Sequence, residues 1–336
     1  MKELLKKLCA LDGVPGYEDE VREFIEKAVA PYATSMEVDP VGNLIVFKKG
    51  AKPRKRPLAL FAHMDEVGLI ITNITDSGFL KFKALGIETE CLMQRAVKIN
   101  GKINGVISGK PVHLLSGEEA KKLPKADSLY IDIGASSKEE AEKVVSIGDS
   151  AVICGEFLVQ NGKIISKAID DRIGCAILIN LIRNFEEYDF YASFSVQEEV
   201  GTRGAKVASF AVNPDCAIVL EGTTASDIAG VPEDKTVCHL GWGPAVSFMD
   251  RATSYDRAFY KAAMSSGIKC QTKASVTGGN DAASIHLSRE GVRTVVISVP
   301  CRYIHSESSV ADISDMENAY KLAEYMLLMI ASGEIE

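Results

Sequence analysis

The chain has 336 residues, enough for one large core or for two domains. Its formal net charge of −8 disfavours a nucleic-acid partner, because such partners are bound through clustered cations. No apolar stretch is long enough to span a bilayer, and the N-terminal segment lacks the apolar centre of a signal peptide. The eight cysteines form no C-x-x-C motif, and we expect them to be buried thiols in a cytoplasmic protein.

The first 66 residues predict helices followed by a buried strand. Apolar residues at positions 21, 24, 25 and 28 lie on one face of a helix. The continuous apolar run at 57–62 is typical of a strand that is buried on both faces of a sheet. This run ends directly at His63-Met64-Asp65.

A different pattern extends from about residue 67 to residue 162. Short strand-like runs alternate with turns such as Asn100-Gly101, Asn104-Gly105 and Asn161-Gly162, and a short charged helix is expected at about 138–143. Asn-Gly between apolar runs is a strong hairpin signal. We therefore expect residues 67–162 to form a β-rich domain, inserted into a second domain made of residues 1–66 and 163–336.

After residue 168 strands alternate with helices. We expect helices at 172–185, 254–266 and 312–330, and strands at 190–196, 216–220, 269–276 and 294–299. Pro300 is expected to close the last strand, and Ser314-x-x-Glu317 is expected to be the capping box of the final helix. This order predicts an α/β fold with a mixed sheet covered by helices on both faces.

Polar residues follow several of the expected strands at the point where each strand ends. They are His63 and Asp65, Glu198 and Glu199, Glu221, and His305, with Asp170 and Asp171 ahead of the helix at 172–185. In open α/β sheets the ligand site lies beyond the carboxyl ends of the strands. Any one of these residues alone would more often be a solvated carboxylate or a structural histidine, as we expect for His113, His239 and His286. Their convergence on one sheet edge outweighs this, because a charge beside a buried core is costly.

The set has the composition of a metal site. Two imidazoles and three carboxylates suit zinc first, with cobalt or manganese as alternatives. They are too few for two closed tetrahedral sites unless one carboxylate is shared. Two ions that share a carboxylate and a water form a two-metal hydrolase site. A further carboxylate beside that site can act as general base.

With these motifs the chain resembles the glutamyl-aminopeptidase-like tetrahedral (TET) metallo-aminopeptidases over nearly its whole length. The matching segments are His63-Met-Asp65-Glu-Val-Gly68, Ala168-Ile-Asp170-Asp171-Arg172, Gln197-Glu198-Glu199-Val-Gly201, Gly278-Gly279-Asn280-Asp281-Ala282 and Arg302-Tyr-Ile-His305-Ser306. Each motif is short, and the five together in this order are specific. The resemblance implies an aminopeptidase that uses two divalent metal ions to remove N-terminal residues from short peptides.

The resemblance also implies the metal ligands. His63 and Glu221 would bind one ion, and Glu199 and His305 would bind the other. Asp170 would bridge the two ions. The family usually has aspartate at the fourth ligand position, where this chain has Glu221. The longer side chain still reaches a metal ion, although it can change which metal is preferred and which substrates are accepted.

Further features follow from the same resemblance. Asp65 would hold the ring of His63 in the correct tautomer. Glu198 would be the general base that takes a proton from the metal-bridging water. A non-proline cis peptide bond is expected between Asp170 and Asp171. The domain at 67–162 would be a dimerisation domain, and dimers would assemble into a tetrahedral homododecamer.

Other functions remain open from the residues alone. A related two-metal hydrolase could act on another amide, such as an N-acyl amino acid, or on a glycoside. The glycosidase is the weaker alternative, because it needs two metal-free carboxylates beside the sugar. A third alternative is a catalytically silent assembly protein, and the presence of Glu198 beside a full ligand set argues against it.

Overall fold

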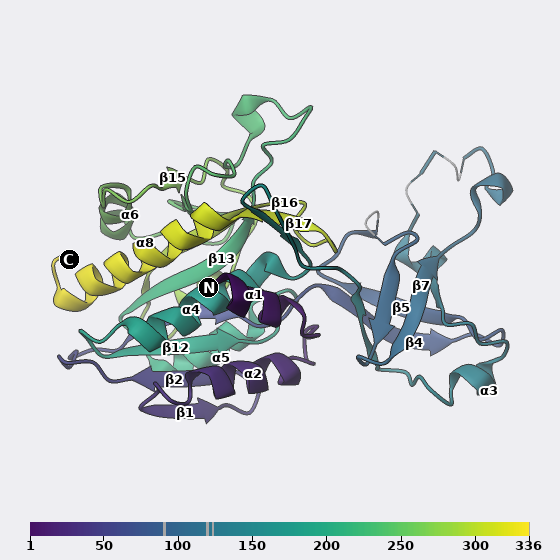
Figure 1. The fold of residues 1–336 in the computed structure, drawn as a ribbon, viewed down its shortest axis with the longest axis horizontal. Coiled ribbons are helices and arrows are strands. Elements are labelled where there is room, and N and C mark those ends of the chain that lie inside the picture. The colour runs from purple at the N-terminus through teal and green to yellow at the C-terminus, as the bar shows by residue number, and fades with distance from the viewer. Residues whose placement is uncertain (90–91, 119–120, 123, 336) are drawn as a thin grey trace.

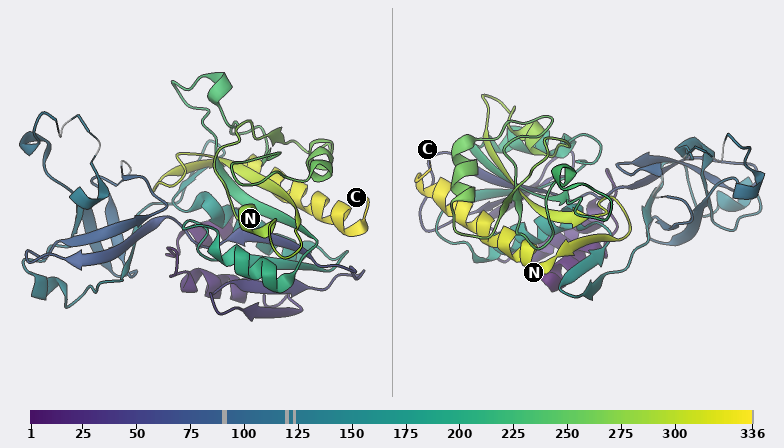
Figure 2. Two further views of the ribbon diagram at one scale, coloured as in Figure 1. Left: turned by 180° about the vertical axis from the view of Figure 1, so that it is seen from behind. Right: turned by 90° about the horizontal axis from the view of Figure 1, so that it is seen from above.

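The computed structural model describes residues 1–89, 92–118, 121–122 and 124–335, and the chain forms two units that lie side by side (Figure 1). The larger unit contains an eleven-stranded sheet, and the smaller unit is a closed barrel. Two further views show the same arrangement, with the barrel projecting from one end of the larger unit (Figure 2). The predicted α/β class, with a separate β-rich part, is confirmed.

The large sheet is mixed, and its central strands are parallel. Its main path runs β1 (Ser35–Val38), β2 (Leu44–Lys48), β12 (Phe190–Ser195), β3 (Leu58–His63), β13 (Cys216–Thr224), β16 (Arg293–Arg302), β17 (Ser309–Asp312), β11 (Lys163–Ser166) and β10 (Leu158–Gln160). β14 (Ala245–Val246) pairs with β16 and with β15 (Gln271–Thr272). Because β12, β3, β13 and β16 run parallel, their carboxyl ends meet at one edge of the sheet.

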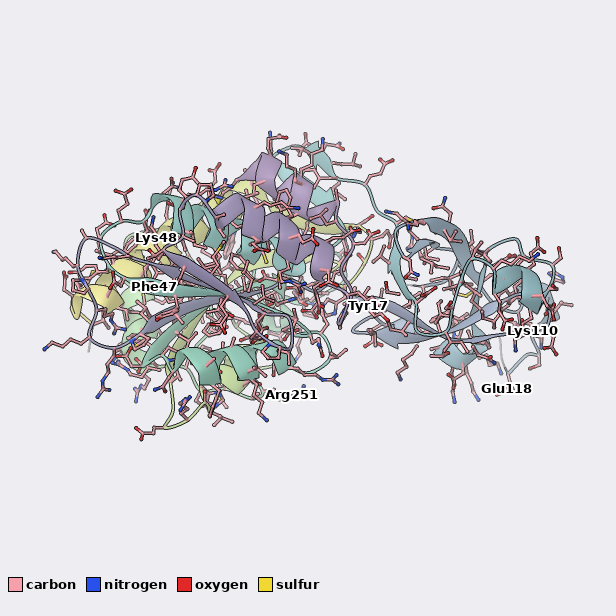
Figure 3. All side chains as sticks on the ribbon, turned by 90° about the horizontal axis from the view of Figure 1, so that it is seen from below. Tyr17, Phe47, Lys48, Lys110, Glu118 and Arg251 are labelled. Atoms are coloured by element: carbon pink, nitrogen blue, oxygen red, sulfur yellow. The ribbon has the colours of Figure 1, made fainter. Side chains whose placement is uncertain are left out.

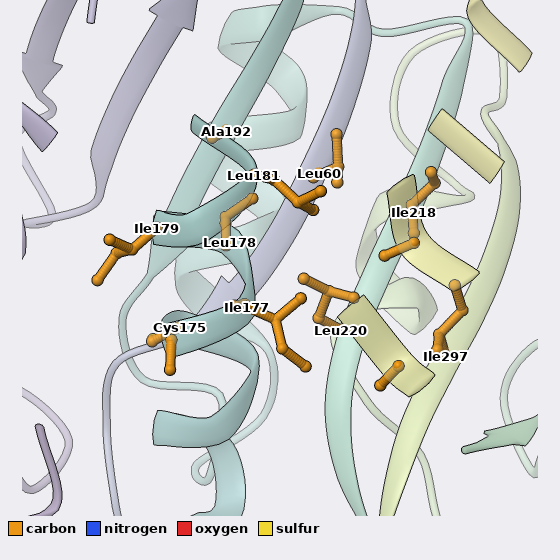
Figure 4. Packing of buried hydrophobic residues seen from close by; sticks show 14 of the residues in the cluster. Leu60, Cys175, Ile177, Leu178, Ile179, Leu181, Ala192, Ile218, Leu220 and Ile297 are labelled. Atoms are coloured by element: carbon orange, nitrogen blue, oxygen red, sulfur yellow. The ribbon is translucent and has the colours of Figure 1, made fainter. Parts of the chain in front are cut away.

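The central strands are buried on both faces, as their continuous apolar sequences predict. Side chains alternate along a strand, so Leu58 and Leu60 of β3 join the core on one face, while Ala59 and Phe61 join the core on the other. Figure 4 shows the apolar side chains of α4 (Ile169–Asn184) packed onto the first of these faces, beside Leu60.

Helices cover both faces of the sheet. The face that carries Leu60 is covered by α1 (Lys2–Cys9), α2 (Asp19–Val29), α4, α6 (Arg257–Met264) and α8 (Ile313–Ser332). The opposite face is covered by α5 (Arg203–Val212) and α7 (Ala282–Ile285). A short 3-10 helix, η4 (Glu233–Lys235), lies between β13 and β14 in the chain. Within the described part of the chain, no helix is both long enough and apolar enough to cross a membrane.

The barrel has its own apolar core, separate from that of the sheet. It is built from β4 (Gly68–Ile74), β5 (Leu80–Leu85), β6 (Ala96–Ile99), β7 (Ile103–Ser108), β8 (Tyr130–Asp132) and β9 (Ser150–Ile153), and its loops carry η2 (Val112–Leu114), η3 (Ala126–Ser128) and α3 (Lys138–Ala141). The boundary predicted at residue 162 lies beyond the barrel, because β10 and β11 pair within the large sheet. Asn161 and Gly162 do form a two-residue hairpin turn, with both residues at positive φ, but this hairpin belongs to the larger unit.

Two central strands are longer than predicted. β13 continues to Thr224, so Glu221 lies inside the strand rather than after it. β16 continues through Pro300, which lies between the residues paired with β14 and those paired with β17. The missing N–H of Pro300 therefore interrupts neither of these two ladders.

Two helices begin later than predicted, because aspartate side chains cap them. Asp256 accepts the backbone N–H groups of Ala258 and Phe259, so α6 starts at Arg257. Asp312 accepts the N–H of Ser314 at 2.7 Å, so Ser314-x-x-Glu317 is not the capping box of the final helix. The strand predicted at 269–276 is reduced to the two residues of β15.

The barrel touches the larger unit at a few defined points. The Tyr17 hydroxyl donates a hydrogen bond to the carbonyl of Gly148, and Figure 3 shows Tyr17 where the two units meet. Nζ of Lys98 in β6 lies 3.0 Å from Oδ2 of Asp12. These contacts join the barrel to the segment between α1 and α2 (residues 10–18).

Candidate metal centre

The five predicted ligands come together at the carboxyl edge of the large sheet. His63 is the last residue of β3, and Glu221 lies in the neighbouring strand β13. Glu199 follows β12 and His305 follows β16, so four of the ligands come from the four parallel strands. Asp170 lies in the first turn of α4 and reaches the same edge.

The Asp170 carboxylate lies between two histidines. Its Oδ1 is 3.4 Å from Nε2 of His63, and its Oδ2 is 3.4 Å from Nε2 of His305. Nε2 of His63 is also 3.1 Å from Oε1 of Glu221, and Nε2 of His305 is 3.3 Å from Oε1 of Glu199. The residues therefore form two groups, each of one imidazole and two carboxylates, that share Asp170.

The spacing of these atoms fits a pair of divalent metal ions. Ligand atoms bound at about 2.0–2.2 Å to a tetrahedral zinc ion lie about 3.3–3.6 Å from one another. The separations of 3.1–3.4 Å observed here are close to that range. Oε1 of Glu199 and Oε2 of Glu221 are buried without a hydrogen-bond partner among the described residues, which is costly unless a cation meets them.

The electrostatics of the cluster also suit a cation. Burial raises the pKa of Glu199 and Glu221 well above their usual values. Burial alone would lower the pKa of His305, but hydrogen bonding to Asp170 and the charge of Glu199 raise it to about 9. Burial alone would likewise lower the pKa of His63, but the surrounding carboxylates, Glu221 foremost, raise it well above its usual value. Buried carboxyls and imidazoles that shift one another's pKa in this way are typical of a functional site.

Asp171 is a weaker ligand candidate than its neighbour Asp170. Ligand atoms of His63, Asp171 and Glu221 lie within 4.8 Å of one another. However, the buried carboxylate of Asp171 accepts the N–H of His63 at 3.2 Å and the N–H of Gly174 at 2.9 Å. It is therefore engaged with the backbone, and it fixes the end of β3 against the start of α4.

Asp65 connects His63 to the loop that carries Glu198 and Glu199. Its two carboxylate oxygens accept the N–H groups of Glu198 and Glu199, each at 3.0 Å. Nδ1 of His63 lies 3.1 Å from the carbonyl oxygen of Asp65 and 3.4 Å from its carboxylate. The nearer carbonyl is the acceptor for Nδ1–H, and this tautomer turns the Nε2 lone pair towards Asp170 and Glu221.

Glu198 lines the same cavity but belongs to neither ligand group. The cavity has a volume of about 180 Å³ and is lined by ligand residues, by Glu198 and by the turn at Gly278–Asn280. Burial raises the pKa of the Glu198 carboxyl well above its usual value, although the charge of His63 opposes this. β12 ends at Ser195, so Glu198 and Glu199 lie in a turn, where adjacent side chains can face one cavity.

The loops that carry the ligands hold unusual backbone conformations. Ala168, Gln197 and His305 have φ angles of +55°, +57° and +60°. Such conformations cost about 1 kcal/mol or more for non-glycine residues, and they concentrate at functional sites. The peptide bond between Asp170 and Asp171 is cis, which confirms the prediction.

The sequence patterns missed two residues that support the ligand loops. Gly86, after β5 of the barrel, is so close to Glu199 that a Cβ there would lie 2.8 Å from its Oε2. Oε1 of Glu18 accepts the N–H of Gly16 at 2.8 Å and the N–H of Gln197 at 3.1 Å. Both contacts join segments that are far apart in the sequence, and no local motif marks either residue.

A buried ionic network lies behind the cluster. Arg172 is fully buried and donates to the carbonyl of Met64 at 2.9 Å, and its guanidinium lies 3.2 Å from Oε1 of Glu66. Nζ of Lys167 lies 2.7 Å from the same carboxylate and 3.5 Å from Asp12. This network holds the segment after β3 against the start of α4.

The remaining histidines lie outside the cluster, as predicted. Nε2 of His239 is 3.0 Å from Glu233, and the ring stacks on Trp242. Nδ1 of His286 lies 2.7 Å from the carbonyl of Ala282, and His113 belongs to η2 of the barrel. The seven described cysteines are free thiols, and Cys91 lies outside the described residues.

Known proteins share both this sequence pattern and this fold. Residues 42–322 match the family model described as M42 glutamyl aminopeptidase. A lysyl aminopeptidase of Pyrococcus furiosus is 34% identical, over 97% of this chain and 96% of its own. A TET aminopeptidase from the archaeon Thaumarchaeota archaeon SCGC AB-539-E09 superposes with a TM-score of 0.93 at 34% identity, covering 98% of each chain.

A third relative is known as an assembly. The TET1 peptidase of Pyrococcus horikoshii, described as able to form a tetrahedron or a large octahedral shell, superposes with a TM-score of 0.84 at 34% identity. The match covers 96% of this chain and 98% of the relative. The chain therefore belongs to the M42 glutamyl aminopeptidase family, whose members are hydrolases that act on peptide bonds.

Proposed function

We propose that the protein is a metal-dependent aminopeptidase that removes N-terminal residues from short peptides. One observation carries this proposal: two groups of one imidazole and two carboxylates share Asp170, and a further buried carboxylate, Glu198, stands beside them. A shared carboxylate is what a two-metal hydrolase needs, and an uncommitted carboxylate is what its general base needs.

The chain offers one complete ligand set for each of two ions. His63, Glu221 and Oδ1 of Asp170 would hold the first, and His305, Glu199 and Oδ2 of Asp170 would hold the second. Zinc is the proposed metal, with cobalt or manganese as alternatives for the same imidazole and carboxylate donors. When bound, such ions supply Lewis acidity to the attacking water and to the scissile carbonyl.

Glu198 would move the proton in the reaction. Its carboxylate would accept a proton as the water oxygen bonds to the scissile carbonyl carbon. It would then pass that proton to the peptide nitrogen as the carbon–nitrogen bond breaks. Asp65 would position this base, because one of its oxygens holds the Glu198 N–H and its backbone holds the ring of His63.

The size of the cavity favours removal of terminal residues over cleavage inside a long chain. A volume of about 180 Å³ accommodates a side chain or two, and most of the residues that line it are polar. A glycosidase would require two metal-free carboxylates beside the sugar. Here Asp170, Glu199 and Glu221 all contact histidine, and Glu198 alone is uncommitted.

A panel of substrates on the zinc-loaded protein tests the proposal. Aminoacyl p-nitroanilides should be hydrolysed, while the same compounds blocked by an N-acetyl group, free N-acyl amino acids and aryl glycosides should not. Preferential turnover of N-acyl amino acids or of glycosides would assign one of the alternative hydrolase functions. A folded, metal-loaded protein that turns over none of them would be an assembly protein.

We also propose that the barrel mediates self-assembly, first into dimers and then into a tetrahedral dodecamer. The barrel projects from the larger unit and exposes Val106, Leu114, Val144 and Ile147, of which Ile147 is 66% exposed. Large exposed apolar side chains favour burial in an interface. The relative from Pyrococcus horikoshii forms closed shells with the same fold.

The proposed location is the cytoplasm. The seven described cysteines are unpaired, and most of them are buried. Unpaired thiols are typical of a reducing compartment. Fractionation of cells that express the protein would test this directly.

A further inference from the structure

The cavity beside the ligand cluster contains a lysine without a partner. Lys273 lines this cavity and is only 8% exposed. Among the described residues, no carboxylate or other side chain forms an ion pair or a hydrogen bond with its ammonium group. Its backbone N–H donates to the carbonyl of Val246 at 3.0 Å, and its charge acts on the buried thiol of Cys238. Lys167 is equally buried and pairs with Glu66 and Asp12. Buried lysines are almost always paired, so Lys273 requires an explanation.

The fold places Lys273 three strands away from Glu221, in the wall of the same cavity. Lys273 follows β15, which pairs with β14, and β14 pairs with β16 at Ser298. Ser298 is in turn the neighbour of Glu221 on β13. Strands lie about 4.8 Å apart, so the backbone of Glu221 and that of Gln271 in β15 are separated by about 14 Å across three strand spacings. Glu221 lines the cavity at one end of this path, and Lys273, two residues beyond Gln271, lines the same cavity.

The rest of the cavity wall suits a polar group. The wall also includes the hydroxyl residues Thr223, Thr224 and Ser298, while only Val237 and Ile304 have apolar side chains among the lining residues. An apolar side chain bound here would leave the ammonium desolvated and unpaired. A cationic side chain would face it directly, which costs several kcal/mol. An anionic side chain would satisfy it.

We propose that Lys273 determines specificity by binding the side-chain carboxylate of an acidic first residue, so that the substrates are peptides that begin with glutamate or aspartate. This inference rests on the proposed aminopeptidase function. The family alone does not decide the point, because relatives carry both glutamyl and lysyl names. The unpaired ammonium within the cavity decides it for this chain.

Chromogenic substrates test the proposal. Glutamyl and glutaminyl p-nitroanilides have the same shape and differ in charge, and neither has a C-terminal carboxylate that Lys273 could bind instead. We expect kcat/KM for the glutamyl compound to exceed that for the glutaminyl compound roughly 10- to 100-fold, the range of one charge-assisted hydrogen bond. Lys273→Met should bring the ratio near 1. Lys273→Glu should favour the lysyl compound. Lys235→Met, at an exposed lysine, is the matched control and should leave the ratio unchanged.

The possible outcomes separate the role of Lys273 from the proposed aminopeptidase function. A wild-type enzyme that hydrolyses leucyl p-nitroanilide but prefers the glutaminyl to the glutamyl compound overturns the role of Lys273 and leaves the aminopeptidase function intact. A Lys273→Met effect confined to dipeptides with a free C-terminal carboxylate would place the lysine on the leaving side, which also overturns the proposal. Failure on every aminoacyl compound overturns the proposed function itself. Calorimetry supplies a second readout, since free glutamate should bind at least 10-fold more tightly than glutamine. The wild-type ratio decides the question even if a variant fails to fold.

Discussion

A single methyl group on the barrel should weaken the proposed metal centre. Gly86 follows β5, and a Cβ added there would lie 2.8 Å from Oε2 of Glu199 and 2.8 Å from a methyl group of Val67. Gly86 also has a φ of +69°. In Gly86→Ala, the Glu199 side chain must therefore move away, because the backbone on both sides of residue 86 is held within the barrel and its junction.

The size of the effect follows from these distances. Oε2 of Glu199 must move by about 0.5 Å to reach an ordinary contact distance, whereas metal–ligand distances tolerate about 0.2 Å. Displaced supports of metal ligands typically cost 10- to 100-fold in affinity. We expect a loss of that size for the ion held by Glu199 and His305. The ion held by His63 and Glu221 should be bound nearly as in the wild type.

Gly134→Ala is the matched control. Gly134 has a φ of +78°, but a Cβ there meets no atom within 4 Å. Both variants should lose about 1–2 kcal/mol of stability from the left-handed backbone, and only Gly86→Ala should lose metal affinity. Competition with a chromophoric chelator measures both zinc dissociation constants. Equal affinities in the two variants would refute the inferred contact between the barrel and the metal centre.

Four other predictions follow from the structure. Glu198→Gln should keep both ions and lower kcat by about 10²–10⁴-fold, whereas Glu199→Gln should lose one ion, which metal analysis beside kinetics measures. Arg172→Met leaves Glu66 with one fewer buried partner and should cost about 3–5 kcal/mol in urea unfolding, against less than about 0.5 kcal/mol for Lys27→Met on the surface. Burial raises the pKa of Glu18 from 4.5 to about 7, so the folded state binds more protons than the unfolded state, and the wild type loses stability as pH rises through this window. Because the glutamine in Glu18→Gln does not titrate, the free energy of unfolding of the variant should increase relative to that of the wild type by about 2–3 kcal/mol between about pH 4.5 and about pH 8, which calorimetry measures. Replacing residues 67–154 by a short linker should reduce the assembly size in light scattering, and an unchanged mass would contradict the role of the barrel.

The ends of the buried strands were the most informative part of the sequence. Apolar runs that stop at charged residues predicted where His63, Glu199 and His305 lie, because parallel strands deliver their carboxyl ends to one edge. Glu221 lies at the same edge, although β13 continues past it and the predicted strand ends before it. The periodicity locates a strand well, but the pairing that extends a strand by a few residues depends on its neighbours.

Contacts between distant segments could not be predicted in the same way. The approach of Gly86 to Glu199, the support of Gln197 by Glu18 and the place of Lys273 in the same cavity as the proposed ligands all depend on tertiary packing. Local chemistry also competed at helix starts: Asp312 and Ser314 can both cap a helix, and the aspartate does so here. The end of the barrel was misplaced because a hairpin signal at Asn161-Gly162 does not reveal which sheet the hairpin joins.

Stoichiometric zinc titration tests the central claim most directly. Protein stripped of metal with a chelator is titrated with zinc while turnover of an aminoacyl p-nitroanilide is followed, with wild type and Glu199→Gln side by side. The account predicts no turnover without zinc and an activity that saturates at two equivalents per chain in the wild type. Turnover that persists in the stripped protein, or that saturates at one equivalent, would contradict a centre in which Asp170 is shared by two ions.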